Sequence, residues 1–293
     1  MTIAFALLGA PVRYPSSHDL ALADRVTYLL HQRFRYTYDA PVRDLDHRLV
    51  VVPRQRHGDQ RRRLQSVTVS AEDARITNRR DRAGNTVTRV RVPLVPAEVE
   101  FVLDAVVERA GPQVGEALPA AALTDPRLLL PTRLTAADPA IRDLAAAMAS
   151  RDGLATAERF CAYVHEALAD AQGETSVTTT AAEALAGGRG VGQDSAHLMI
   201  ALCRAAGLPA RYVSGHLLGE GGTHAWVEVV VPDPVGARAV ALDPCNGRAA
   251  GKDYVTVATG RDYADVAPTS GTYAGTARGT LTTTKRVGVG LVT

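Results

Sequence analysis

Three short segments of this 293-residue sequence carry side chains that could act together in catalysis. They read GVGQDSAH over residues 190–197, HAWVEV over residues 224–229, and VALDP over residues 240–244. An aspartate that accepts a hydrogen bond from a histidine fixes the tautomer of the ring and stabilises its protonated form, so the other ring nitrogen can serve as a base. His224 and Asp243 are therefore the candidate acid–base pair.

The segment at residues 190–197 opens a predicted helix, and the start of a helix suits a nucleophile. Unpaired backbone N–H groups and the positive end of the helix dipole lower the pKa of a thiol placed there and can also stabilise an oxyanion. The helix is apolar on most faces and ends at Gly207, before Pro209. Three strand-like runs follow, at residues 210–218, 223–231 and 237–243. Neighbouring antiparallel strands can bring His224 and Asp243 together.

The preceding part of the chain divides into strand-like and helical stretches. Runs rich in Val, Thr and Tyr with polar turns between them predict an antiparallel β-sandwich; they cover residues 26–42, 45–55, 64–71, 74–81, 85–94 and 97–108. A linker is expected over residues 111–131, and Asp138 before Pro139 then marks the start of a helical region. Helices followed by an antiparallel sheet make the second part, and the chain as a whole, α+β.

These motifs, in this order, resemble the bacterial transglutaminase-like superfamily, whose core has the papain-like fold of cysteine enzymes. YTYDAPVRDLDHRLVVVPR resembles the β-rich N-terminal domain often fused to that core, and the resemblance runs from about residue 26 to residue 280. It implies an N-terminal extension, a β-sandwich domain, a transglutaminase-like core and a C-terminal strand, at residues 1–24, 25–112, 113–276 and 277–293. It also implies that His224 is the catalytic histidine and Asp243 the residue that orients it.

The sequence departs from the family at the nucleophile, because Gly192 stands where the family has cysteine. Glycine has no side chain, so no acyl-enzyme can form there. Ser195 lies three positions along the helix and Cys245 two residues past Asp243, and both are candidates to replace the thiol. The residues expected to line the site are Gln193, Asp194, Ser195, Trp226 and Cys245. By contrast, His197 and Cys203 are expected to be buried in the helix.

Two classes of function follow, together with a third explanation. The first is a repurposed enzyme in which His224 and Asp243 perform general acid–base chemistry, such as hydrolysis, cyclisation or proton transfer, on a carbonyl-containing small molecule or peptide in a biosynthetic pathway. The second is an inactive pseudoenzyme that keeps the cleft as a binding module. The third is an ordinary cysteine protease or amidase whose nucleophile has been altered.

Composition narrows the choice of partners and compartment. The net charge of +2 does not favour nucleic acid, and the arginine-rich stretch at residues 54–63 lacks the interleaved aromatic residues of a single-strand site. The three cysteines are too widely spaced for a disulfide framework or a CxxC metal site, so no metal and no cofactor are expected. The apolar start has no basic segment before it, and we expect no signal peptide, no membrane association and a cytoplasmic protein. The oligomeric state is left open.

Overall fold

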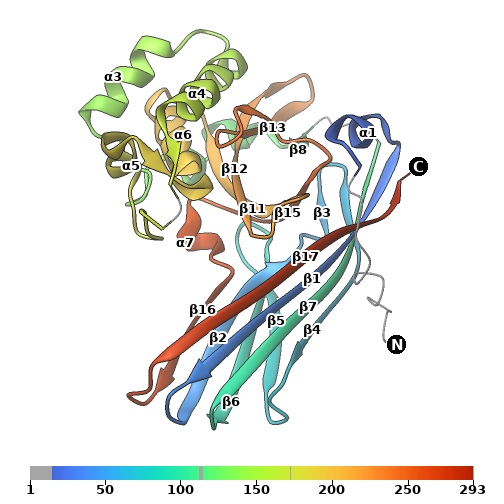
Figure 1. The fold of residues 1–293 in the computed structure, drawn as a ribbon. Coiled ribbons are helices and arrows are strands. Elements are labelled where there is room, and N and C mark those ends of the chain that lie inside the picture. Colours follow the sequence, from blue (N-terminus) through green and yellow to red (C-terminus); the bar gives the residue numbers. More distant parts are fainter. Residues whose placement is uncertain (1–14, 112–114, 172, 293) are drawn as a thin grey trace.

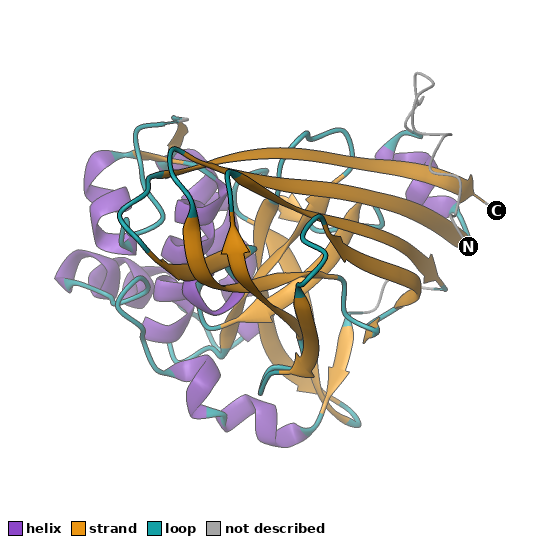
Figure 2. Cartoon of the chain, turned by 90° about the horizontal axis from the view of Figure 1, so that it is seen from below, coloured by secondary structure: helices purple, strands orange, loops and turns teal. Residues whose placement is uncertain are grey.

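The computed structural model describes residues 15–111, 115–171 and 173–292 of the chain. In Figure 1 long strands extend away from a part in which helices lie beside a smaller sheet, and Figure 2 shows most of the helices on one side of the molecule, with one short helix apart from them near the C-terminus. The expected N-terminal extension lies mostly outside the described residues, and its described end contains helix α1 (Ser17–Leu22). None of the described helices is both long and apolar enough to cross a membrane.

Two antiparallel sheets form the long-stranded part of the molecule. The first has the strand order β17 (Gly279–Val292), β1 (Arg25–Tyr38), β7 (Glu98–Ala110), β4 (Gln60–Val69) and β3 (Arg56–His57). The second has the order β16 (Thr269–Ala274), β2 (Val42–Val52), β6 (Thr86–Val95) and β5 (Arg75–Arg80). Every predicted run from residue 26 to residue 108 thus overlaps a strand.

Alternating side chains explain how these two sheets enclose a core. Along β1, Val26, Tyr28 and Leu30 are fully buried, while the residues between them are partly exposed. Successive side chains of a strand point to opposite faces, so this alternation gives β1 one apolar face. Residues of β1 and β7 belong to the same apolar cluster as Leu45 of β2 and Val90 of β6. Both sheets therefore pack on one shared core.

The second part of the molecule places helices against another antiparallel sheet. The strand order is β14 (Arg248–Ala249), β13 (Gly236–Asp243), β12 (His224–Asp233), β11 (Ala210–Leu217) and β15 (Tyr254–Gly260), and β8 (Glu116–Leu118) pairs with β13. The helices are η2 (Ala120–Thr124), α2 (Pro126–Leu129), α3 (Pro139–Met148), α4 (Gly153–Ala167), α5 (Ala181–Gly187), α6 (Gly192–Ala205) and α7 (Tyr263–Val266), and the short strands β9 (Ala169–Asp170) and β10 (Arg189–Gly190) pair in parallel between them. Helix α6 is buried from Asp194 to Arg204 and packs on β12.

Some boundaries differ from those expected from the sequence. The stretch predicted as a linker contains β8, η2 and α2, because β8 adds to the edge of β13; residues 112–114 lie outside the described residues. Strand β16 falls before the expected core boundary at residue 276, yet it pairs with β2 of the long-stranded part. The C-terminal strand β17 pairs with β1 over most of its length. The end of the chain thus contributes a strand to each of the two long sheets.

Buried amide side chains attach the long sheets to strand β15, which lies at the edge of the second part. The amide of Gln60 donates to the carbonyl oxygen of Thr256 at 2.8 Å and accepts from its N–H at 2.9 Å. Asn85 forms the same pair of bonds with Thr259, at 2.7 and 2.9 Å. These amides take the place of a neighbouring strand and satisfy backbone groups that an exposed edge would leave unpaired.

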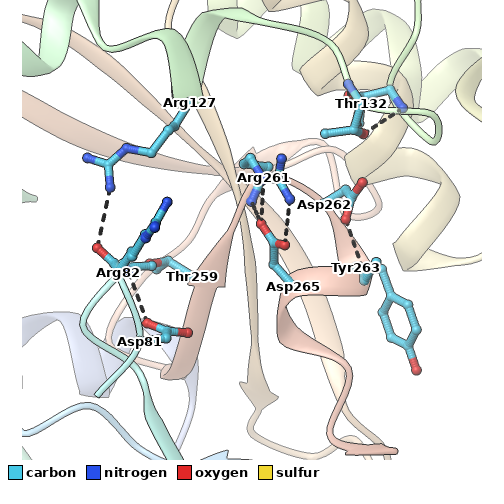
Figure 3. Close-up of polar contacts among 12 residues, drawn as sticks. Asp81, Arg82, Arg127, Thr132, Thr259, Arg261, Asp262, Tyr263 and Asp265 are labelled. Atoms are coloured by element: carbon cyan, nitrogen blue, oxygen red, sulfur yellow. Dashed lines mark hydrogen bonds and ion pairs between the residues drawn. The ribbon is translucent and has the colours of Figure 1, made fainter. Parts of the chain in front are cut away.

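Charged side chains add contacts near this junction. Figure 3 shows Arg127 of α2 pointing to the backbone of Arg82, whose carbonyl oxygen it reaches at 3.4 Å, and Arg261 paired with Asp265. Two members of the arginine-rich stretch also bind backbone carbonyl oxygens: Arg61 donates to that of Gly58 and Arg62 to that of Pro53.

We predict that Gln60→Ala lowers the free energy of unfolding by about 2–3 kcal/mol, because it leaves two buried backbone groups of Thr256 without partners. Gln65→Ala on the same strand is the matched control, since Gln65 is exposed, and its effect should stay within about 0.5 kcal/mol. Urea denaturation of both variants measures the difference. Equal losses in the two variants would contradict the role given to Gln60.

Candidate active site

His224 and Asp243 meet where two neighbouring strands of the second sheet begin and end. His224 is the first residue of β12 and Asp243 the last of β13, and the two strands pair antiparallel. Nε2 of His224 lies 2.7 Å from Oδ2 of Asp243, and both residues are buried. The geometry that the sequence predicted for this pair is therefore present.

The carboxylate of Asp243 is surrounded by hydrogen-bond donors. Besides His224, its Oδ2 accepts from the hydroxyl of Tyr254 at 2.6 Å and from the amide of Asn246 at 2.7 Å. Its Oδ1 accepts from the backbone N–H groups of Cys245 at 2.9 Å and Asn246 at 3.2 Å. Burial alone would raise the pKa of Asp243, but the hydrogen bond and charge of His224 and the other side-chain donors hold it below its ordinary value.

Tyr254 and Asn246 were not assigned a role from the sequence. Asn246 stands within the motif LDPCN, three residues past the aspartate, and that spacing was the available signal. Tyr254 reaches Asp243 from the start of β15, and no motif spacing in the sequence predicts this contact.

Gly192 lies on the other side of the His224 ring. A Cβ atom added to this glycine would stand 3.8 Å from Nδ1 and Cε1 of His224 and 3.8 Å from the carbonyl oxygen of Ala225, which is ordinary van der Waals contact. Since Nε2 is held by Asp243, the ring turns Nδ1 towards the place where the family has a thiol. The backbone around Gly192 therefore keeps the position of a nucleophile whose side chain is missing.

A second carboxylate, which the sequence did not predict, occupies the Nδ1 side of His224. Oε2 of Glu220 lies 3.0 Å from Nδ1, and the Glu220 side chain is 42% exposed while that of His224 is 5% exposed. Burial disfavours the charged ring, but the hydrogen bonds and charges of Asp243 and Glu220 outweigh it and raise the pKa of His224 to about 9. His224 is thus an imidazolium at neutral pH. In this arrangement it is a proton donor, whereas the sequence suggested a free basic nitrogen.

The start of helix α6 is built around Asp194. Its Oδ2 accepts from the backbone N–H of Val191 at 2.9 Å and from the hydroxyl of Thr175 at 2.7 Å, so this side chain caps the helix. A Cβ on Gly190 would stand 2.7 Å from Cβ of Asp194, which explains the glycine there. Asp194 was expected to line the site, and its observed contacts are those of a capping residue.

Of the other candidates from the helix, one is half-buried and two are buried. Gln193 is half-buried and its amide lies 3.4 Å from the carbonyl oxygen of Ser176. Ser195 is 4% exposed, a position with little access for a substrate. His197 is fully buried and accepts from the N–H of Tyr263, and burial lowers its pKa to about 4. His197 is therefore a neutral core histidine, as the sequence suggested.

The three cysteines are in environments that keep thiols protonated. Burial raises the pKa of Cys245 to about 11, with the charges of Asp243 and Glu220 adding to the effect. Burial likewise raises the pKa of Cys161 and Cys203 to about 12. A thiolate is the reactive form of cysteine, so none of these side chains is activated to replace the missing nucleophile.

Trp226, the last residue expected to line the site, packs close to His224 but opens on a different cavity. Its ring centre lies 6.3 Å from that of His224, and it packs over Gly215, where an added Cβ would stand 2.4 Å from the indole. A cavity of about 320 Å³ is lined by Trp226 and Tyr254 together with Gln60 and Arg109 of the long sheets. Neither His224 nor Gly192 lines this cavity.

Three side chains beside that cavity have the spacing of metal ligands. His57, Glu116 and Glu228 offer atoms that lie within 4.8 Å of one another. However, Arg211 donates to both carboxylates, and Nε2 of His57 lies 2.6 Å from Glu228. Because these cations already neutralise the carboxylates, an added metal ion would have to displace them. The arrangement fits an internal ion-pair network between the two parts of the molecule.

Comparisons with known proteins agree with the fold. Residues 28–108 match the bacterial transglutaminase-like N-terminal region, and residues 142–244, which include Gly192, His224 and Asp243, match the transglutaminase-like superfamily. The two matches together span more than half of the chain. The chain belongs to the transglutaminase-like superfamily.

Similar sequences and a similar structure are known. Uncharacterized proteins of Mycobacterium bovis and Mycobacterium tuberculosis are 41% identical over 111 residues, which is 34% of this chain and 35% of each relative. One from Mycobacterium leprae is 39% identical over 113 residues, covering 35% of this chain and 39% of that protein. The match thus spans little more than a third of these curated relatives. The structure of a candidate cysteine protease from Cytophaga hutchinsonii aligns over 91% of both chains with a TM-score of 0.73 and 22% identity, a likeness of fold.

The pKa of His224 predicts a pH-dependent stability for this transglutaminase-like chain. Its folded value of about 9 lies above the ordinary 6.5, so the stabilisation is complete below pH 6.5 and is lost as the pH rises through about 9. The loss amounts to at most about 3 kcal/mol. Urea denaturation of the wild type and His224→Gln at several pH values measures it. The stability difference between the two proteins should shrink with rising pH, and a constant difference would contradict the raised pKa.

The space beside Gly192 predicts that Gly192→Cys folds and has an activated thiol. The helix start and the imidazolium of His224 should lower the pKa of this thiol, so that iodoacetamide alkylates it roughly tenfold faster at neutral pH than an ordinary free cysteine. Ser195→Cys, one turn deeper and buried, is the matched control, and the parent protein measures the background of its own three cysteines. An ordinary thiol pKa in Gly192→Cys would mean that His224 and the helix start do not act on that position.

Proposed function

We propose that this chain is a transglutaminase-like enzyme that works without a cysteine nucleophile and uses His224 and Asp243 for general acid–base chemistry at a substrate carbonyl. The observation that carries the proposal is the anchoring of Asp243 by five hydrogen bonds, which orients His224 towards the position beside Gly192. These donors keep Asp243 ionised beside the ring, which is the state in which it can orient His224 and stabilise its imidazolium form.

The reaction class follows from the missing nucleophile at residue 192 and from the imidazolium of His224 beside it. Without a side chain at residue 192, attack on the carbonyl must come from water or from a nucleophile within the substrate, which corresponds to hydrolysis or cyclisation. The imidazolium can donate a proton to the carbonyl oxygen, and the N–H groups of Gly192 and Gln193, the first two residues of α6, support the same developing charge. The substrate is a carbonyl-containing small molecule or peptide, and a cytoplasmic biosynthetic pathway is the setting that we propose.

A binding module without catalysis is the second candidate, and one contact favours it. Glu220 closes the Nδ1 side of His224, so the resting site holds an internal ion pair where a substrate would enter. If this pair never opens, no substrate reaches Nδ1 and the dyad takes no part in catalysis, as expected of a binding module. The third explanation, an altered cysteine enzyme, is addressed by the Gly192→Cys variant, which restores the thiol.

We predict that His224→Ala lowers the hydrolysis of p-nitrophenyl acetate and of a peptide 4-nitroanilide by about 100-fold, because the proton donor is lost. Asp243→Asn should lower the rate as well, since an amide neither fixes nor stabilises the imidazolium. His18→Ala is the control, because His18 is an exposed histidine of α1. Full activity in His224→Ala would exclude the acid–base function and leave the binding module.

A further inference from the structure

The proposal that follows rests on the acid–base function above and adds a residue to it. We propose that Glu220 is a catalytic residue of this site, the general base that takes a proton from the attacking water while His224 donates from Nδ1 to the carbonyl oxygen. The site then contains a chain of three groups, Glu220, His224 and Asp243, in place of a thiol, a histidine and an aspartate. Its chemistry is hydrolysis of an ester or amide without a covalent intermediate.

Glu220 lies at the ring nitrogen of His224 that faces the vacated position. Its Oε2 lies 3.0 Å from the ring nitrogen that faces Gly192, and a side chain at residue 192 would contact the same nitrogen. The carboxylate is therefore the group that this chain presents on the side where its family has a nucleophile. A carbonyl group placed at this nitrogen would lie within reach of both Glu220 and the start of α6.

Exposure separates the two carboxylates that contact His224. Asp243 is fully buried and its oxygens are occupied by five donors, whereas the Glu220 side chain is 42% exposed. With one imidazolium between two carboxylates the three groups carry a net negative charge, so they can take up one proton. Glu220 is the member in contact with solvent, and the proton from a water molecule goes to its carboxylate.

The loop that carries Glu220 is built to let the ion pair open. Glu220 lies between Gly219 and Gly221, in the connection from β11 to β12. Gly219 has a φ of +89°, and added Cβ atoms at Gly219, Gly221 and Gly222 would meet nothing within 4 Å. Packing does not require these glycines, and they widen the range of backbone conformations open to the loop. Its backbone contacts include the N–H of Glu220 to the carbonyl oxygen of Leu217 at 3.2 Å and the carbonyl oxygen of Gly222 to Nδ1 of His216 at 3.4 Å. A small shift of this loop admits a carbonyl group and a water molecule between the carboxylate and the ring.

The reaction balances with these groups alone. Water oxygen forms a bond to the carbonyl carbon and gives one proton to Glu220, while the carbonyl oxygen receives the π electron pair and the proton of His224 Nδ1. In the second step the bond to the leaving group breaks, and that group takes the proton from Glu220. The new hydroxyl returns a proton to His224 as the carbonyl reforms. The products are a carboxylic acid and an alcohol or amine, and the site is restored.

The pH dependence of hydrolysis tests this assignment. For the wild type acting on p-nitrophenyl acetate and a peptide 4-nitroanilide, we expect hydrolysis that depends on Glu220 and on His224, with a rate that falls as the pH passes about 9, where His224 loses its proton. Glu220→Gln should lower the rate by about 100-fold, because glutamine cannot accept the proton. Glu220→Asp should retain part of the activity.

The control is Glu72→Gln, which removes an exposed carboxylate from the turn between β4 and β5 and should leave the profile unchanged. A Glu220→Gln variant with the wild-type rate or a higher one would overturn the proposal, and a higher rate would identify Glu220 as a latch. Loss of activity in His224→Ala with full activity in Glu220→Gln would overturn the role of Glu220 and leave the acid–base function intact. No His224-dependent hydrolysis in the wild type would overturn both proposals.

Discussion

A buried carboxylate that must be fully hydrogen-bonded determines the arrangement of this site. Asp243 has no contact with water, and its charge is stable only because a histidine, a tyrosine, an asparagine and two backbone N–H groups point at it. Satisfying it requires the end of β13, the start of β12 and the start of β15 to converge. That convergence fixes the position of His224. Because Nε2 is bound to Asp243, the ring then directs Nδ1 towards Gly192.

The attachment of the long sheets to the second part depends on polar contacts as much as on apolar packing. Strand β15 is an edge strand of one sheet, and the amides of Gln60 and Asn85 take the place of the neighbour it lacks. Since β15 also begins with Tyr254, a partner of Asp243, the same strand connects the long sheets with the dyad. The N-terminal part thereby supports the site at a distance, and none of its described residues bonds to His224 or Asp243.

Sequence patterns predicted the strands and helices that have a hydrophobic period and the residues that belong to a motif of known order. They missed a contact made by a residue in a loop. Alternation in residues 26–42 predicted β1, and the apolar helix after Gly192 predicted α6. The order of His224 and Asp243 along the chain predicted their hydrogen bond. Glu220 could not be found in this way, because it lies in a glycine-rich connection that has no periodicity. The side chain of a residue in such a loop can point in many directions. Cys245 was placed near the dyad correctly, but its protonated state depends on burial, which the sequence does not reveal.

The absence of a side chain at Gly192 also changes how the protein responds to its chemical surroundings. Thiol-dependent enzymes lose activity when peroxides or alkylating agents modify the thiolate. Here the groups beside the vacated position are an imidazolium and two carboxylates, and burial keeps the three thiols of the chain protonated, with pKa values of about 11 to 12. If the proposed acid–base chemistry operates, it requires no reduced thiol. With glycine at residue 192, the position has no thiolate that peroxides or alkylating agents could modify.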